Sequence, residues 1–203
     1  MCMNMSPLEQ AVQFHGHICP GLLKGLRVAE FALSYLGVDP DRDEELVAIV
    51  EHDSCGVDAI QAVLGCTFGK GNLIFQDYGK QVYTIASRQK NRAVRVYEKF
   101  GVLKGPEFDR FRELARKDVL TAGEEAEKED LRGVLFEVIM SMPFEELFTY
   151  REVDLELPPR AKISATVRCE VCGEGVMETR ATSTERGLVC PDCLNRVGGG
   201  YNV

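Results

Sequence analysis

Two pairs of cysteines near the C-terminus constrain this chain more than any other feature. Each pair has the spacing Cys-x2-Cys, and 17 residues separate the two pairs, as in four-cysteine zinc sites. The expected ligands are Cys169, Cys172, Cys190 and Cys193. A segment of about 40 residues buries little apolar surface, so bound metal would supply much of its folding free energy. We therefore predict a structural, zinc-ribbon-like zinc finger over residues 163–203, with redox-active cysteine pairs as the alternative.

The other four of the eight cysteines lie within residues 2–66, which indicates a second site. No signal peptide is evident and no run of about 18 apolar residues occurs, so we expect a cytoplasmic protein whose thiols stay reduced, without a membrane span. The net charge of −8 argues against broad contact with nucleic acid. The finger itself has four basic and five acidic residues, which favours protein contact over contact with nucleic acid.

The rest of the chain predicts an α+β core over residues 1–155, with helices packed on a small, mainly antiparallel sheet. Capping signals and apolar spacing predict helices over 6–14, 20–36, 55–65, 91–101, 106–120 and 124–142. Strands are expected over 45–53, 72–76 and 82–88, the last two joined as a hairpin through "YGKQ". An extended connector follows from residue 148, and Pro158-Pro159 marks a linker over 156–162 before the finger.

The stretch "FHGHICPG" contains two of the three histidines of the chain. Cys19 precedes Pro20, and Cys55 follows a possible helix cap at Asp53 or Ser54, so both sulfurs are expected at helix N-termini, which favour thiolates. The predicted core site is His17, Cys19 and Cys55 around one Zn²⁺ or another transition metal.

The remaining features of this core site stay open. His15, Asp58 or Cys66 is expected as a fourth ligand or as a hydrogen-bonding partner of a ligand. Cys19, Cys55 and Asp58 are also the candidate catalytic residues. An open coordination position would allow Lewis-acid chemistry, whereas a closed site would be structural or sensory. The alternative is that these histidines are polar turn residues and the cysteines are small core residues.

The glycine-rich segment "GCTFGKGN" predicts a weak anion or substrate contact through Lys70 and Asn72. Its spacing differs from that of a P-loop, because Gly65 and Gly69 are too close together and Gly71 stands where Ser or Thr is required. A simple turn before the next strand is the alternative.

The segments "HGHICPG", "CGVDAIQAVLGCTFGKGN" and "DYGK", in this order, resemble the family of the E subunit of formylmethanofuran dehydrogenase. The resemblance implies an α+β core, frequently an intertwined homodimer, with a metal near its His and Cys residues, and some members add a C-terminal zinc finger. The implied site residues are His17, Cys19, Cys55, Asp58, Gln61, Cys66, Lys70 and Asn72. His52 lies outside these signatures.

The resemblance also implies association with a molybdenum or tungsten enzyme that reduces carbon dioxide to a formyl group on methanofuran, the first step of methanogenesis. The chain has no dense iron–sulfur cysteine run, so we expect an accessory metalloprotein of one-carbon metabolism rather than the redox catalyst. Two other hypotheses stay open. One is a metal-responsive regulator or adaptor that uses its finger for protein or RNA contact, and the other is zinc that only holds a dimer together.

Overall fold

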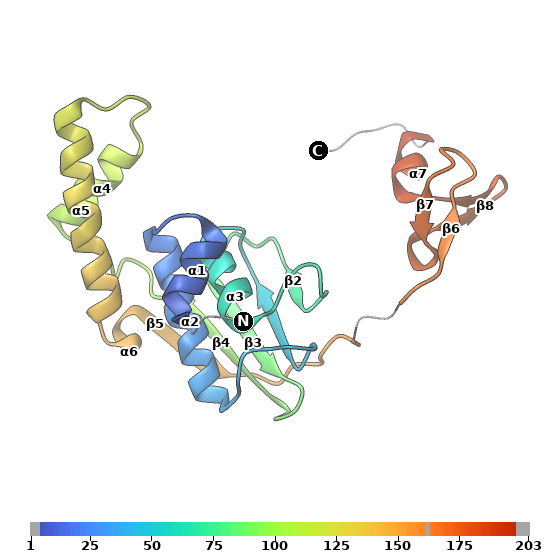
Figure 1. The fold of residues 1–203 in the computed structure, drawn as a ribbon, viewed down its shortest axis with the longest axis horizontal. Coiled ribbons are helices and arrows are strands. Elements are labelled where there is room, and N and C mark those ends of the chain that lie inside the picture. The colour runs from blue at the N-terminus through green and yellow to red at the C-terminus, as the bar shows by residue number, and fades with distance from the viewer. Residues whose placement is uncertain (1–4, 161–162, 198–203) are drawn as a thin grey trace. The chain divides into compact units, whose positions relative to one another are not determined.

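The computed structural model describes residues 5–160 and 163–197. The chain forms two compact units, Met1–Arg160 and Ala161–Val203 (Figure 1). The outer ends of the expected core and finger, together with Cys2 and two residues of the expected linker, lie outside the described residues. Among the residues described, no helix is both long and apolar enough to cross a bilayer.

The first unit contains a five-stranded sheet with the strand order β2-β1-β3-β4-β5. Its strands are β1 (Leu46–Val50), β2 (Leu73–Phe75), β3 (Val82–Ser87), β4 (Arg92–Glu98) and β5 (Phe148–Glu152). Only the β1–β2 pair is parallel, and the other three pairs are antiparallel. The mixed fold with a mainly antiparallel sheet is therefore as predicted.

Two local predictions are wrong. Residues 91–101 were expected to be helical, but most of them form β4, because Val94 and Val96 alternate into the core while Arg95 and Tyr97 lie on the other face. The runs around "YGKQ" do not pair as a hairpin, since β2 and β3 lie on opposite sides of β1. Every residue of β1 is buried, which suits a strand with neighbours on both edges.

Two further details differ from the sequence-based expectation. The hairpin of this region joins β3 to β4, and its turn places Asn91 at a φ of 50°. The connector expected from residue 148 begins as β5, which pairs with β4. Both differences arise from pairing between strands that a local pattern does not reveal.

The helices α1 (Pro7–His15), α2 (Pro20–Leu36) and α3 (Gly56–Leu64) pack together on one face of the sheet (Figure 1). The predicted capping box at the start of α1 is present, because the Ser6 hydroxyl accepts from the Glu9 amide and the Glu9 carboxylate accepts from the Ser6 amide.

Helices α2 and α3 meet through their backbones. A Cβ placed on Gly25 would lie 2.2 Å from the Gly56 carbonyl oxygen, so only glycine fits at that point. This close approach brings the start of α3 beside the start of α2.

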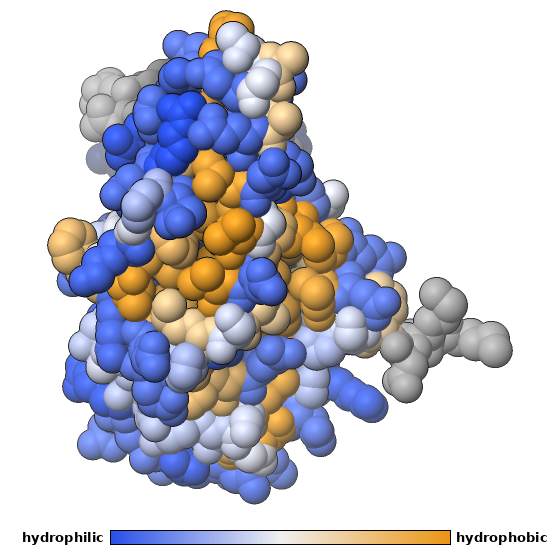
Figure 2. All heavy atoms as spheres, turned by 90° about the vertical axis from the view of Figure 1, so that its left-hand side faces the viewer, coloured by the Kyte–Doolittle hydropathy of each residue, from blue (hydrophilic) through white to orange (hydrophobic). Residues whose placement is uncertain are grey.

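Three more helices complete the unit: α4 (Pro106–Ala115), α5 (Ala122–Ser141) and α6 (Phe144–Leu147). Arg110 forms a two-bond ion pair with Glu127 and joins α4 to α5. Arg27 of α2 donates to the Ile139 carbonyl oxygen of α5 at 2.6 Å. Figure 2 shows hydrophobic side chains gathered on the side of the first unit that carries these helices.

The second unit is built from short elements: β6 (Thr166–Arg168), β7 (Gly175–Met177), the 3-10 helix η1 (Glu178–Arg180), β8 (Thr182–Thr184), β9 (Gly187–Val189) and α7 (Pro191–Val197). The unit contains two hairpins, β6–β7 and β8–β9, and the second lies between the two cysteine pairs. The first hairpin encloses Cys169 and Cys172, so each cysteine pair is presented by a hairpin end or a helix start.

Candidate metal centres

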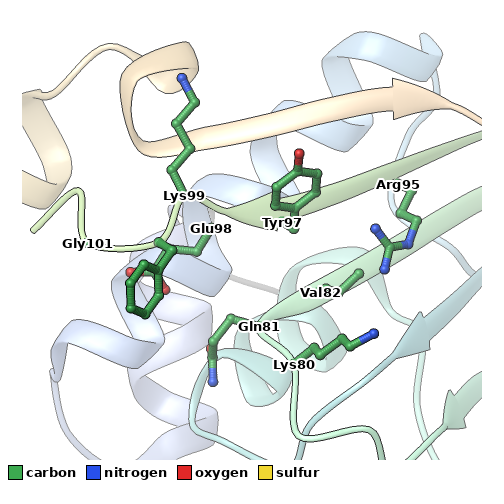
Figure 3. A pocket seen from close by; sticks show the side chains of 9 residues that line it. Lys80, Gln81, Val82, Arg95, Tyr97, Glu98, Lys99 and Gly101 are labelled. Carbon is green, nitrogen blue, oxygen red and sulfur yellow. The ribbon is translucent and has the colours of Figure 1, made fainter.

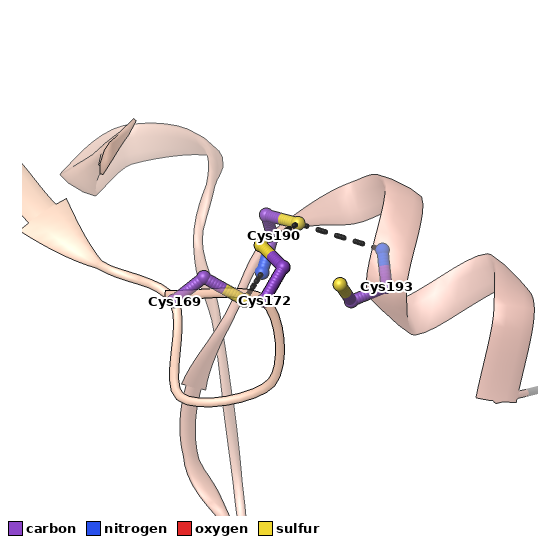
Figure 4. A group of neighbouring side chains, drawn as sticks. All are labelled: Cys169, Cys172, Cys190 and Cys193. Atoms are coloured by element: carbon purple, nitrogen blue, oxygen red, sulfur yellow. Dashed lines mark hydrogen bonds between the residues drawn. The ribbon is translucent and has the colours of Figure 1, made fainter. Parts of the chain in front are cut away.

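The four C-terminal cysteines converge on one point. Their sulfur atoms all lie within 4.8 Å of one another (Figure 4). Cys169, Cys190 and Cys193 are buried, whereas Cys172 is exposed. Four converging cysteines, three of them buried, in a unit with little other core are consistent with a zinc-ribbon-like domain.

Backbone amides point at these sulfurs. The Cys190 amide donates to the Cys169 sulfur at 3.3 Å, and the Cys193 amide donates to the Cys190 sulfur at 3.4 Å. Hydrogen bonds from the backbone at Cys172 and Cys190 lower the pKa of Cys169 to about 6. Burial, followed by the neighbouring thiols, raises the pKa of Cys193 to about 12, so in the protein alone Cys169 is the cysteine whose thiolate is favoured. Four converging thiols are a donor set for soft metal ions. The cluster therefore fits a bound metal ion.

A second cluster of ligand atoms lies between α1 and α2. His15 is the last residue of α1, Gly16 turns the chain with a φ of 91°, and Cys19 caps α2 by accepting from the Leu22 amide at 3.3 Å. The ligand atoms of His15, His17 and Cys19 all lie within 4.8 Å of one another. The positive φ at Gly16 allows the two histidines to turn back toward Cys19.

Asp58 of α3 orients the first histidine of this cluster. Its Oδ2 atom lies 2.7 Å from His15 Nδ1, and Gln61 donates to its other oxygen at 3.3 Å. Because a carboxylate requires a donor, His15 carries its proton on Nδ1 and leaves Nε2 as the free ligand atom. That Nε2 lies 3.7 Å from the Cys19 sulfur. A carboxylate behind a histidine is the usual arrangement around a metal-bound imidazole.

Cys55 lies beside this cluster without being among its closest ligand atoms. A Cβ on Gly21, in the first turn of α2, would lie 3.2 Å from the Cys55 Cβ. Cys55 itself, rather than Asp53 or Ser54, occupies the capping position of α3, and its side chain makes no capping bond. Burial, followed by the neighbouring Cys19, raises the pKa of Cys55, so the expected stabilisation of its thiolate by the helix does not dominate.

Cys66 lies elsewhere, in the hydrophobic core, and it is outside the His15 cluster. Its side chain is fully buried, and burial raises the pKa of its thiol to about 12. A role as a fourth ligand stays a prediction.

Lys70 and Asn72 make contacts within the protein. The Lys70 ammonium lies 2.5 Å from Asp41 Oδ2, and the Asn72 amide donates to the same oxygen at 3.0 Å. Asn72 Oδ1 accepts from the Thr67 amide at 2.9 Å. These bonds hold the glycine-rich loop against Asp41, a residue that the sequence did not single out. A role of Lys70 and Asn72 in binding a cofactor stays a prediction.

A pocket of about 320 Å³ adjoins the core cluster. His15, Cys55 and Asp58 line it together with the apolar side chains of Val50, Leu73 and Phe75. The pocket is therefore large enough for a small organic molecule and offers it both polar and apolar side chains.

His52 also lines this pocket, although it lies outside the sequence signatures. It is 3% exposed, and its Nδ1 accepts from the Ser54 amide at 3.2 Å. Burial, followed by the charge of Lys24, lowers the pKa of His52, so it is neutral with its proton on Nε2. That Nε2 has no hydrogen-bond partner among the described residues. His52 was not expected at this site from the sequence, and only the arrangement of β1 and α3 shows that it lines the pocket.

The first unit matches a known protein family over most of its length. The model of the family described as "FmdE, Molybdenum formylmethanofuran dehydrogenase operon" matches residues 14–149. A protein of Archaeoglobus fulgidus, named as a probable S-adenosyl-L-methionine-binding protein, is 35% identical over 204 residues. The match covers 97% of this chain and 54% of that protein, so the chain spans about half the length of this curated relative.

A crystal structure has the same fold. It is that of a tungsten formylmethanofuran dehydrogenase FmdE-like protein from Syntrophus aciditrophicus, which is 24% identical. The superposition has a TM-score of 0.61 and covers 96% of this chain and 92% of the other. At this level of identity the likeness concerns the fold alone.

Proposed function

This chain belongs to the FmdE family, and from that premise we propose that it is an accessory metalloprotein of one-carbon metabolism with a reactive metal centre in its core. The observation that supports this proposal most is the convergence of His15, His17 and Cys19, with Asp58 orienting His15. Two imidazoles and a thiolate suit Zn²⁺ or a similar transition metal.

Cys55 is the proposed fourth residue of this centre. Its pKa is raised in the protein alone, and a bound cation would favour its thiolate. Coordination by Cys55 would close the site, whereas a free Cys55 would leave a position open toward the adjoining pocket. In the open form the metal supplies Lewis-acid chemistry, and the chain's own residues bind and orient a small molecule against it. Cys19, Cys55 and Asp58 remain the candidate catalytic residues.

For the second unit we propose a structural zinc ion and a protein partner. Val171 and Met177 are 44% and 59% exposed, although the unit contains little apolar core. Exposed apolar side chains of this kind suit contact with another protein better than contact with RNA. The partner would be part of a molybdenum or tungsten dehydrogenase. A metal-responsive adaptor is the second candidate function, because the finger and the core centre lie in separate units.

We also propose that the first unit forms a homodimer through the side that carries α4 and α5. Figure 2 shows hydrophobic side chains gathered there, and Val134 and Met140 of α5 are 43% and 41% exposed. Burial of such a surface in a second copy would remove apolar area from water. Sedimentation equilibrium of the wild type and of a Val134→Glu variant tests this proposal.

The name of the Archaeoglobus relative adds S-adenosyl-L-methionine as a ligand to test. The match covers 54% of that relative, so the experiment asks whether the shared half carries the binding site. Calorimetric titration of the metal-loaded protein with S-adenosyl-L-methionine tests this binding. If the chain binds the ligand, the heat of binding should saturate at one ligand per chain.

Anaerobic measurement of metal per chain tests the proposed centre. The full-length protein should contain about two ions, and a Cys190→Ser, Cys193→Ser variant should contain about one. In that variant background, His15→Ala and Cys19→Ala should remove the remaining ion. Cys66→Ala separates the two candidates for the fourth ligand, because the ion is kept when Cys55 is that ligand and is lost or weakened when Cys66 is. Retention of the ion by His15→Ala and Cys19→Ala would contradict the proposal.

A further inference from the structure

A second pocket lies on the face of the sheet opposite α1, α2 and α3. Val82 of β3 pairs with Tyr97 of β4, so their side chains share one face, while Tyr83 and Val96 point into the core on the other. The pocket has a volume of about 560 Å³ and is built from the start of β3, the end of β4 and the loop that follows. Its size is in the usual range for small-molecule sites.

Positive charge surrounds this pocket in a chain whose net charge is −8. Lys80, Arg95 and Lys99 line it (Figure 3). In the figure, Lys80 and Gln81 lie at the start of one strand, and Tyr97 and Lys99 lie at the end of the neighbouring strand.

The acidic groups near the pocket are neutralised. Glu98 forms an ion pair with Lys24 at 2.7 Å, and both side chains are 18% exposed. Arg95 pairs with the buried Glu51 at 2.9 Å. Within residues 5–160, Lys80 and Lys99 have no ion pair, and the Lys99 ammonium donates only to the Glu145 carbonyl oxygen at 2.5 Å. Two uncompensated positive charges therefore remain at the rim.

Aromatic rings accompany these charges. The Arg95 guanidinium lies 5.9 Å from the centre of the Tyr97 ring, and the Lys80 ammonium lies 5.9 Å from that of Tyr78. Phe100 also lines the pocket and is fully exposed to solvent. An exposed phenylalanine beside free cations offers a stacking surface for a planar ring, and the ring is removed from water when a ligand covers it.

We propose that this pocket binds a small aromatic anion, a planar ring that carries a phosphate or a carboxylate. Lys80, whose side chain extends beside Arg95 in Figure 3, binds the anionic group, and Phe100 and Tyr97 contact the ring. The Lys99 side chain extends away from Lys80 and adds positive charge at the rim. The site is distinct from the metal centre but adjoins the same turn, since the Gln81 amide and the Ser54 hydroxyl lie 3.4 Å apart and Ser54 precedes Cys55.

Calorimetric titration of the full-length, metal-loaded protein tests this inference. The probes are AMP, which carries a ring and a phosphate, and anthranilate, which carries a ring and a carboxylate. Adenosine lacks the anion, and ribose 5-phosphate lacks the aromatic ring. We expect AMP or anthranilate to bind with a Kd below about 1 mM, and the two incomplete probes to bind at least about fivefold more weakly. A preference for AMP or for anthranilate shows which combination of ring and anionic group fits the pocket better.

Variants of exposed residues identify the site without disturbing the core. A Lys80→Gln, Lys99→Gln variant should weaken binding about tenfold, and Phe100→Ala should weaken it about fivefold. Lys90→Gln is the matched control, because Lys90 is exposed in the turn at the opposite end of the β3–β4 hairpin. Metal content should stay unchanged in all three variants.

Two results would overturn the inference. One is the absence of saturable binding of both AMP and anthranilate up to about 5 mM. The other is equal affinity of the wild type and the Lys80→Gln, Lys99→Gln variant for the probe that binds. Either result leaves the metal measurements at His15 and Cys19 unaffected, so the two proposals fail independently.

Discussion

Replacement of Asp58 by asparagine should weaken metal binding at the core centre about tenfold. The carboxylate lies 2.7 Å from His15 Nδ1 and fixes both the orientation and the tautomer of that imidazole. Asparagine has nearly the same size, so the change removes the negative charge and leaves the packing of α3 in place. The variant therefore reports on the role of the carboxylate behind the ligand.

The expected size of this loss in metal affinity follows from the exposure of the His15 and Asp58 side chains. A hydrogen bond to a charged group contributes about 1.5–3 kcal/mol when it is well buried. The His15 and Asp58 side chains are 11% and 35% exposed, so solvent screening places this bond at or just below the lower end of that range. A loss of about 1.4 kcal/mol corresponds to a tenfold change in the dissociation constant.

Competition with a chromophoric chelator measures this change. The Cys190→Ser, Cys193→Ser background restricts the measurement to the core centre, and anaerobic conditions keep the thiols reduced. Asp53→Asn is the matched control, because Asp53 is an exposed acid that lines the same pocket and makes no bond to His15 in the described structure. An unchanged affinity in Asp58→Asn, or an equal loss in both variants, would refute the assignment of His15 as an oriented ligand.

Three further outcomes are expected. Gly25→Ala should lower the free energy of unfolding, measured in urea, by about 3 kcal/mol, because its Cβ would overlap the Gly56 backbone. Gly133→Ala is the control, since the space around Gly133 is open, and it should raise the free energy of unfolding by up to about 1 kcal/mol. Equal effects of the two substitutions would contradict the close packing of α2 and α3. Burial alone would raise the pKa of Asp41, but its hydrogen bonds, led by that from Lys70, hold it below its ordinary value. Its ionised carboxylate thus stabilises the fold above about pH 4, and this contribution disappears as the pH falls through the lowered pKa. Asp41→Asn should therefore make the free energy of unfolding in urea depend less on pH in the acid range. The same pH dependence in the variant and the wild type would refute this. A strong chelator should abolish hydrogen-exchange protection in residues 163–197 without reducing protection of the β1, β3 and β4 amides, and equal loss in both units would show that they do not unfold independently.

Local sequence signals predicted several elements well. The capping box of Ser6 and Glu9 and the terminating glycine at Gly37 bound α1 and α2 close to the expected residues. These signals involve hydrogen bonds between residues a few positions apart, and they therefore depend little on the rest of the fold.

Other elements depend on distant strands. Residues 92–98 carry charges at helical spacing, but pairing with β3 and β5 on both edges outweighs that weak local preference. The same applies to β2, whose parallel place beside β1 is set by the antiparallel pairing of β3 on the other edge.

The two candidate metal centres differ in the same way. The four C-terminal cysteines lie in two short motifs, and their convergence was determined by the sequence itself, because paired turns direct both thiols of each motif toward one ion. Around His15, the sequence identified the chemistry but not the arrangement. Asp58 lies 43 positions from His15 in the chain and meets it only because α2 and α3 pack through Gly25 and Gly56. The sequence named Asp58 among the candidate partners, but only the tertiary structure decided that it pairs with His15, since a contact between distant residues requires the packed core that brings their helices together.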